Sequence, residues 1–133
     1  MLSNMITLIV LLALNYQIGT GTVFSSVDKY NPNPSQACTG KKLKDSSAVV
    51  AHRELPCGSV VTICNLRTKL CTSAKVTDRG PFGTTKGEYT SVVDMTPSVA
   101  RKISHNGLEP VIVLSSEPIK NEKPKKRKRS PNS

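Results

Sequence analysis

The stretch that decides the fold is SVVTICNLRTKLCTSAKVTDRGPFG, residues 59–83. Residues 59–64 are rich in β-branched side chains, and residues 71–77 alternate apolar and polar positions, so each segment predicts a β-strand. The segment between them, 65–70, is polar at its centre and predicts a hairpin loop. We therefore expect an antiparallel hairpin whose second strand ends at Asp78, directly before a Gly-Pro turn.

The hairpin brings two of the four cysteines together. Cys64 and Cys71 lie at its two shoulders, where a cross-strand disulfide is geometrically reasonable. An even number of cysteines suggests two disulfides in an oxidising compartment, and Cys38–Cys57 then follows by elimination. Zinc is the alternative, but a Cys-x6-Cys spacing is not a zinc knuckle and neither histidine lies at ligand spacing from it. We predict two disulfides, no metal and no other cofactor.

The N-terminal segment contains an uncharged apolar run, MITLIVLLAL, at residues 5–14. A bilayer-spanning helix needs roughly 20 residues, so this run is too short and instead matches the apolar region of a secretory signal peptide. Gly19 and Gly21 place small residues at positions −3 and −1 of a cut before Thr22. We predict a signal peptide over residues 1–21 and an exported protein; an uncleaved membrane anchor is the alternative.

The C-terminal segment is strongly basic in a chain whose formal net charge is +10. It has no large apolar residue after Ile119, so residues 117–133 are predicted to be a disordered tail. The run KPKKRKR at 123–129 is typical of a nuclear localisation signal or nucleic-acid arm, or of a segment that binds anionic polymers by charge. With a signal peptide predicted, we favour anionic envelope polymers and expect no nucleic-acid partner.

The remaining pattern predicts short elements. Residues 92–95 and 110–114 read as strands, and Thr96 followed by Pro97 is a typical helix start. Polar residues and prolines in 22–35 suggest a lead-in arm. Short strands with one small helix predict a compact, mostly β barrel, and the chain length allows one such domain, which we expect to be a monomer.

Four sequence blocks resemble a known family. They are AHRELPCGSVVTICNL (51–66), VTDRGPFG (76–83), VVDMTPSVARKI (92–103) and NGLEPVIV (106–113). Their order and spacing are similar to those of the RlpA-like double-psi β-barrel domain. The resemblance implies a six-stranded double-psi barrel with one or two short helices, over residues 36–116. Proteins related by this fold, such as barwin-like proteins, expansins and lytic transglycosylases, work on polysaccharide walls.

The resemblance also implies an activity. Bacterial members of the family are endolytic peptidoglycan transglycosylases, which cleave the MurNAc–GlcNAc bond without water and leave a 1,6-anhydro sugar. The family's histidine and aspartate correspond to His52 and Asp78, whereas the position of its glutamate is occupied by Lys41. Intact His52 and Asp78 favour a secreted or periplasmic, wall-associated transglycosylase. Lys41 favours a non-catalytic module that binds or loosens wall polysaccharide.

The chemistry assigns provisional roles to the two shared residues. Cleaving a glycosidic bond needs a proton donor and a negative group that stabilises an oxocarbenium-like state. In transglycosylation one carboxyl can serve as acid and then as base, and Asp78 is our candidate, assisted by His52. The alternatives are that Asp78 only caps a turn and that His52 is structural.

Other residues are candidates for binding the glycan. We assign Arg79, Asp94 and Tyr89 to substrate binding, with Asp94 as a second carboxylate of the groove. Electrostatics at the helix start are the alternative role for Asp94. Asp45 or Glu54 could supply the carboxylate that Lys41 replaces. The expected partner is peptidoglycan or another wall glycan.

Overall fold

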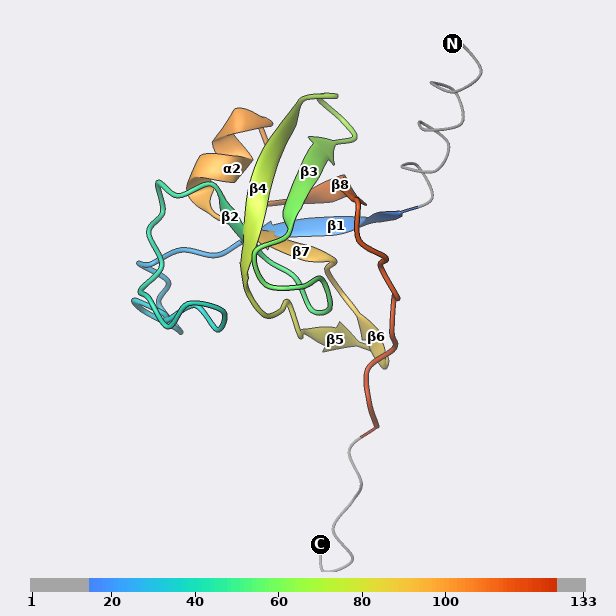
Figure 1. Cartoon of the computed structure of the whole chain (residues 1–133), viewed down its shortest axis with the longest axis horizontal. Coiled ribbons are helices and arrows are strands. Elements are labelled where there is room, and N and C mark those ends of the chain that lie inside the picture. Colours follow the sequence, from blue (N-terminus) through green and yellow to red (C-terminus); the bar gives the residue numbers. More distant parts are fainter. Residues whose placement is uncertain (1–14, 127–133) are drawn as a thin grey trace, which may run out of the picture.

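The computed structural model describes residues 15–126, which fold into a closed six-stranded β-barrel (Figure 1). Around the barrel the order is β1 (Tyr16–Val23), β7 (Val93–Met95), β2 (Val49–Ala51), β4 (Cys71–Asp78), β3 (Val60–Asn65) and β8 (Leu108–Ser115). Outside it lie a two-stranded hairpin of β5 (Thr84–Thr85) and β6 (Glu88–Tyr89), and the helix α2 (Pro97–Lys102). The prediction of a mostly β, six-stranded barrel is confirmed.

The predicted central hairpin is β3–β4, and it is antiparallel as expected. Cys64 and Cys71 are directly opposed in its register and form a disulfide with a Cα–Cα distance of 4.0 Å. Cys38 and Cys57 form the second disulfide. Both predicted pairings are confirmed. The rival zinc interpretation is wrong because each of the four sulfurs is bonded to its partner in a disulfide and is not a thiolate ligand.

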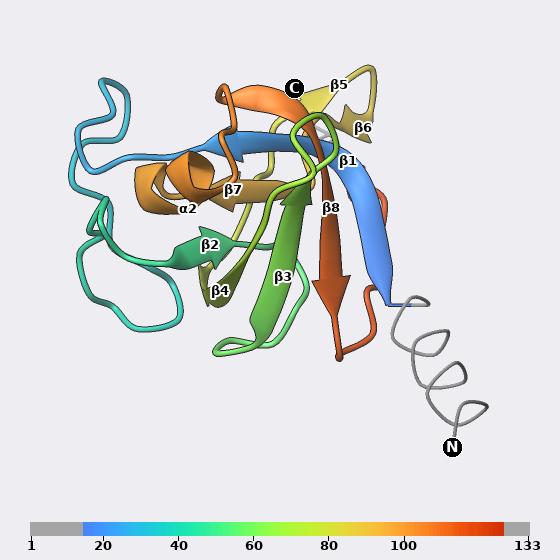
Figure 2. The ribbon, with the colours of Figure 1, turned by 90° about the horizontal axis from the view of Figure 1, so that it is seen from above.

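Two of the strand pairs are parallel, a feature that was not predicted from the sequence. β1 runs parallel to β7, and β2 runs parallel to β4, while the other neighbouring pairs are antiparallel. Parallel neighbours need long connections, and here each parallel pair is separated in sequence by at least one other strand; Figure 2 shows β1 beside β7 and β2 beside β4. β2 therefore lies between β4 and β7, strands that are distant from it in sequence.

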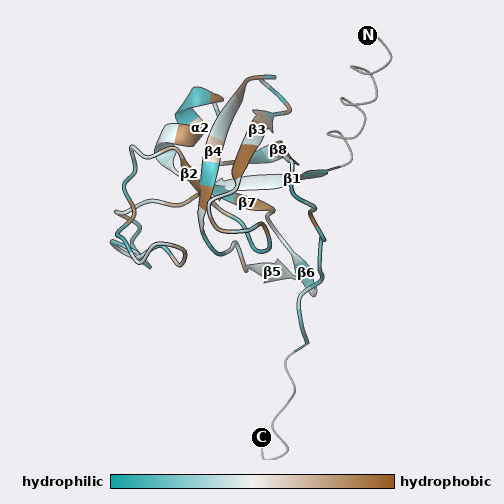
Figure 3. Cartoon of the chain, in the orientation of Figure 1, coloured by the Kyte–Doolittle hydropathy of each residue, from teal (hydrophilic) through white to brown (hydrophobic). Residues whose placement is uncertain are grey.

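The barrel interior is filled by alternate residues of the strands. Val50 on β2, Val76 on β4, and Val93 and Met95 on β7 are fully buried in one apolar cluster. Figure 3 shows the corresponding apolar colouring on β3 and β7. Because side chains alternate across a strand, Asp94 between Val93 and Met95 points out of the core.

The first strand corrects the predicted N-terminal boundaries. β1 pairs with β8 from Tyr16 to Thr22, so the barrel begins at residue 16 and not at the predicted residue 36. The first two residues of the predicted lead-in arm, 22 and 23, belong to this strand. The prediction took Gly19 and Gly21 for cleavage-site residues, but packing requires them. A Cβ on Gly19 would lie 2.5 Å from Val92 Cγ1, and one on Gly21 would lie 3.0 Å from the Met95 methyl carbon.

A cut before Thr22 would divide β1 and remove most of its pairing with β8. We infer that any cleavage compatible with a closed barrel falls before Tyr16. The apolar run of the predicted signal peptide, 5–14, lies outside the described residues. Within residues 15–126, no helix is long and apolar enough to cross a membrane.

The start of the predicted tail is also corrected. Ile119 packs against the apolar core, and the Glu54 carboxylate accepts the backbone N–H groups of Lys120, Asn121 and Glu122 at 2.8–3.0 Å. Residues 117–126, here called the C-terminal strap, descend from β8 and pass beside β6 (Figure 1). Disorder from residue 117 was therefore wrong, because one carboxylate holds three consecutive amides. Residues 127–133 lie outside the described residues.

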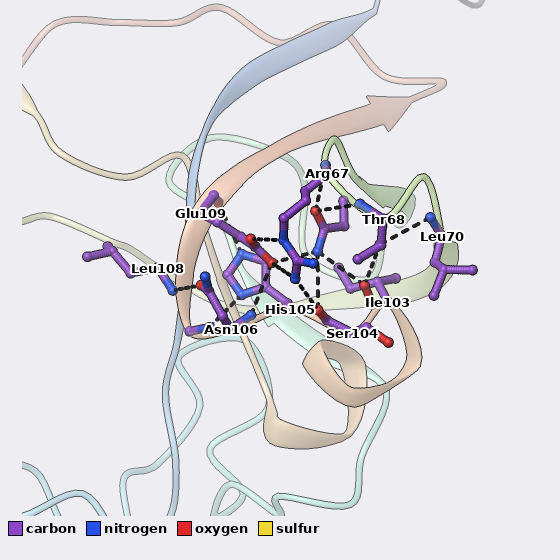
Figure 4. A network of polar contacts seen from close by, with 11 residues as sticks. Arg67, Thr68, Leu70, Ile103, Ser104, His105, Asn106, Leu108 and Glu109 are labelled. Atoms are coloured by element: carbon purple, nitrogen blue, oxygen red, sulfur yellow. Dashed lines mark hydrogen bonds and ion pairs between the residues drawn. The ribbon is translucent and has the colours of Figure 1, made fainter.

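A polar network closes the barrel end at the β3–β4 loop (Figure 4). Glu109 accepts hydrogen bonds from Arg67 Nε at 2.8 Å, from Asn65 Nδ2 at 2.7 Å and from the Asn106 amide at 3.1 Å. These donors, Arg67 first, lower the pKa of Glu109 to about 2. The network ties the hairpin loop to the turn that follows α2.

The Glu109 network predicts a loss of stability in acid. A carboxylate whose pKa is depressed on folding stabilises the protein above its unfolded pKa, near 4.5, and loses this contribution as the pH falls toward about 2. We expect the melting temperature of Glu109→Gln to fall less than that of the wild type between pH 5 and pH 2.5, as measured by circular dichroism. Equal acid slopes for the two proteins would contradict this role.

Candidate functional site

Two aspartates flank β2 at one end of the barrel. Ala51 is the register partner of both Asp94 on β7 and Asp78 on β4. A register shift after Val50 places Asp78, rather than Thr77, opposite Ala51. Since adjacent strands lie about 4.8 Å apart, the two Cα atoms are separated by about 10 Å, with only a methyl side chain between them. We call Asp78, Ala51 and Asp94 the carboxylate row.

Asp94 is the more unusual of the two carboxyls. Burial raises its pKa first, and the negative charge of Asp78 raises it further, although the Thr22 hydroxyl and Arg53 act in the opposite direction. The Thr22 hydroxyl donates a hydrogen bond to Asp94 Oδ1. A carboxyl that keeps its proton to higher pH is suited to donate that proton to a leaving group.

Asp78 makes the contacts expected of a turn cap. Its Oδ1 accepts the backbone N–H groups of Ala37 and Arg79, both at 2.8 Å. Its Oδ2 accepts no hydrogen bond from the described residues, so one oxygen is still available for other interactions. The same side chain can thus cap the turn and present negative charge to the carboxylate row.

His52 is almost fully buried, with 2% of its surface exposed. Its Nδ1 accepts the backbone N–H groups of Glu54 and Leu55, both at 3.1 Å, so the proton resides on Nε2, which donates to Gln17 Oε1 at 2.9 Å. Burial first, and then the charges of Arg53 and Arg79, lower the pKa of His52 to about 4. Both nitrogens are occupied, so this geometry suits a positioning residue.

The low pKa of His52 predicts acid sensitivity in a particular window. The unfolded state takes up a proton near pH 6.5 and the folded state only near pH 4, so stability falls as the pH decreases between these values. We expect roughly 2 kcal/mol less stability at pH 5 than at pH 7 from this group. Urea unfolding at both pH values measures the change, and His52→Gln should lose that slope even though its overall stability is lower.

His52 is connected to the C-terminal strap through Gln17. Gln17 Nε2 donates to Asn121 Oδ1 at 2.6 Å, and the amide of Asn121 donates to the Glu54 carboxylate at 3.0 Å. Because the Glu54 amide donates to His52, these four residues form a closed ring. The strap therefore seals the side of the barrel where His52 lies.

The two nearby arginines make contacts that were not predicted from the sequence. Arg79, assigned to substrate binding, donates through Nη1 to the carbonyls of His52 at 3.1 Å and Leu55 at 2.5 Å, so it holds a turn. Arg53, which we did not predict, lies 3.8 Å from the ring centroid of Tyr89, the aromatic residue that we assigned to the glycan. The sequence around Arg53 does not distinguish it from an ordinary surface cation, which is why it was not predicted.

A cavity lies next to Arg53, the residue that follows His52. It has a volume of about 1020 Å³ and opens between the β5–β6 hairpin and the C-terminal strap. Arg53, Tyr89 and Phe82 line it, but Asp78 and Asp94 do not. Arg53 links the cavity to the carboxylate row electrostatically, because it lines the cavity and its charge lowers the pKa of Asp94.

The other candidate carboxylates are engaged in structure. Asp45 accepts the Ser25 hydroxyl at 2.9 Å and the Ser26 amide at 2.7 Å. Glu54 holds the strap, and Lys41 is exposed. Asp94 is therefore better placed than Asp45 or Glu54 to act as a second carboxylate with Asp78.

Comparison with known proteins gives one informative similarity. No family model matches the chain. The "Probable endolytic peptidoglycan transglycosylase RlpA" of Nostoc sp. (strain PCC 7120) is 30% identical over 100 residues, which is 74% of this chain and 25% of that protein. The chain is similar to RlpA-like proteins. It spans about a quarter of the length of this relative, and its six-stranded barrel and two disulfides support an RlpA-like relationship and fit a protein that works outside the cytoplasm.

Proposed function

We propose that the protein is exported and cleaves the glycan strands of peptidoglycan as a lytic transglycosylase at the carboxylate row. The observation that carries this proposal is the pairing of Asp78 and Asp94 across Ala51, with the pKa of Asp94 raised by burial and by Asp78. The similarity to a probable transglycosylase supports the substrate class.

The proposed reaction uses the two carboxyls differently. Asp94 donates its proton to the glycosidic oxygen as the bond from C1 of the MurNAc residue to that oxygen breaks. Asp78 stabilises the positive charge that develops on the sugar. The 6-hydroxyl of the same sugar then forms the new bond to C1, and its proton passes to the Asp94 carboxylate. The acid is regenerated, no water is consumed, and a 1,6-anhydro product remains.

A non-catalytic wall-binding module is the second candidate. Asp78 caps a turn, His52 is sealed inside the barrel, and Lys41 stands where the resemblance places a glutamate. Such a module would use the same outer face of β2, β4 and β7 to bind glycan without cleaving it.

One experiment separates the two candidates. Purified peptidoglycan sacculi, both intact and stripped of stem peptides, are incubated with protein beginning at Tyr16, and soluble products are identified by mass spectrometry. Anhydro-muramyl products support the transglycosylase. Co-sedimentation without products favours the binding module. Neither products nor co-sedimentation would overturn both.

A further inference from the structure

We propose that the cavity between the β5–β6 hairpin and the C-terminal strap is a subsite for a carboxylate group carried by the wall glycan. This inference rests on the proposed function and adds a specificity to it: acidic strands bind better than the same strands with their carboxyls neutralised. The subsite is lined by five cationic residues, Arg53, Lys86, Lys123, Lys125 and Lys126, and by three acidic residues, Glu54, Glu88 and Glu122.

The acidic lining residues are largely compensated within the protein. Glu54 receives three backbone N–H groups, and Glu88 pairs with Lys123 at 3.9 Å. In the part of the chain that the structure describes, Lys86, Lys125 and Lys126 form no ion pair. Their charges are therefore available to an anion that enters the cavity.

Arg53 supplies the directional element of the subsite. Its Nη1 donates to the carbonyls of Pro81 at 2.6 Å and Ser91 at 2.7 Å, and its guanidinium stacks on Tyr89, so the group is held in one orientation. Its Nη2 makes no hydrogen bond within residues 15–126, whereas its Nε is buried without a partner there. A guanidinium held in this orientation can donate a charge-assisted hydrogen bond through Nη2 to a carboxylate.

The shape of the region fits a substituted sugar. Phe82, which is 60% exposed, and Tyr89 offer aromatic faces to a sugar ring. A smaller cavity of about 180 Å³ shares Arg53 and Tyr89 and reaches Gln17, the partner of His52. Because Arg53 lines both cavities and its charge acts on Asp94, a strand bound at the carboxylate row would lie near the cationic subsite.

The lining favours separate carboxylates over a dense phosphate polymer. The five cations are interspersed with three glutamates, so the lining offers a few separate positive charges and not the continuous basic surface that a polymer with a phosphate at every unit needs. Three basic residues of the predicted tail, Lys123, Lys125 and Lys126, are part of the cavity wall. The tail thus contributes to a binding site, in addition to any tethering by its later residues.

The test compares one glycan in two chemical forms. Stripped strands carry only the lactyl carboxylate of the sugar, and carbodiimide coupling with methylamine neutralises that group. We expect the wild type to bind the acidic form about tenfold more tightly, equivalent to one well-formed charged contact. The triple variant Lys86→Gln/Lys125→Gln/Lys126→Gln should lose most of this preference because, of the lining cations, only Arg53 and the Glu88-paired Lys123 remain. Lys29→Gln/Lys44→Gln/Lys75→Gln, whose lysines lie outside the cavity, should keep the preference.

The outcomes distinguish this inference from the proposed function. Equal binding of both forms by the wild type, or an undiminished preference in the cavity variant, would overturn the subsite while the wall-glycan function stands. No binding of either form would remove both. Adding intact sacculi shows whether stem-peptide carboxylates contribute, since only they raise affinity beyond that of stripped strands.

A second readout works without sacculi. The Arg53 Nε–H signal in a nitrogen–proton spectrum should shift with N-acetylmuramic acid, whose lactyl carboxylate is free, and not with uncharged N-acetylglucosamine. A larger shift with a single-stranded oligonucleotide, lost in the cavity variant, would overturn the glycan assignment in favour of nucleic acid.

Discussion

Asp94→Asn is expected to reduce the release of anhydro-muramyl products from peptidoglycan by at least about 100-fold, the usual contribution of a positioned general acid. The amide cannot donate the proton that the glycosidic oxygen needs, yet it keeps the shape of the side chain and can still bond with the Thr22 hydroxyl. Product release is measured by mass spectrometry under identical protein and sacculus concentrations. Asp28→Asn, at an exposed loop aspartate, is the matched control.

Asp78→Asn should behave differently, because the two carboxyls have different tasks. Removing the negative charge of Asp78 favours ionisation of Asp94, so the pKa of Asp94 should fall. As the pH is raised, the activity of Asp78→Asn should therefore decline at a lower pH than the activity of the wild type. A carbon NMR titration of the Asp94 carboxyl measures the pKa itself, whether or not the protein is an enzyme.

The reverse pattern would change the assignment. If Asp78→Asn abolishes product release and Asp94→Asn retains it, the proton donor is Asp78, as the sequence resemblance first suggested. If neither substitution affects release, the carboxylate row is not the reaction centre.

The sequence predicts best the strands with a β-branched or alternating side-chain pattern and the helix with a typical N-terminal capping residue. The β3–β4 hairpin follows from its β-branched residues, and the Thr96 side chain accepts the Val99 amide as a helix cap should. The Cys64–Cys71 disulfide follows from the hairpin geometry, and Cys38–Cys57 follows from it by elimination. These features are local, so a short stretch of sequence contains the physical cause of each.

The missed features depend on distant contacts. β1 was overlooked because Gly19 and Gly21 resemble a cleavage site. These positions are glycine because the side chains of Val92 and Met95 leave no room for a Cβ atom. The strap was assigned to disorder because nothing in its own sequence reveals that Glu54 binds its amides. Arg53 likewise gains its role only from the hairpin that folds over it.

The site shows the same division. The sequence singles out His52 and Asp78, and the structure places them on adjacent strand ends, where the His52 amide donates to the Asp78 carbonyl at 3.1 Å. It cannot show that Ala51 pairs with both Asp78 and Asp94, because that register is set by barrel closure. The pairing of the carboxyls, and with it the raised pKa of Asp94, is a property of the fold.

Removing the Cys38–Cys57 disulfide with Cys38→Ala/Cys57→Ala is expected to cost about 3 kcal/mol of unfolding free energy. The bond closes a loop with a sequence separation of 19, and the loop-entropy relation gives this magnitude. Urea unfolding followed by circular dichroism measures it. Cys64→Ala/Cys71→Ala, with a separation of 7, is the control and should cost slightly less, about 2.5 kcal/mol.

The two disulfide variants should differ more in the titration of Asp94 than in their free energy of unfolding. Cys38 follows Ala37, whose amide binds Asp78 Oδ1, and the Cys38 amide donates to the Thr77 carbonyl at 3.0 Å. Freeing this loop weakens the cap on Asp78 and alters the charge that Asp94 experiences. We therefore expect the Asp94 titration to shift in the Cys38/Cys57 variant and to stay unchanged in the Cys64/Cys71 variant. Equal titrations in both would mean that the disulfide stabilises the fold without positioning the carboxylate row.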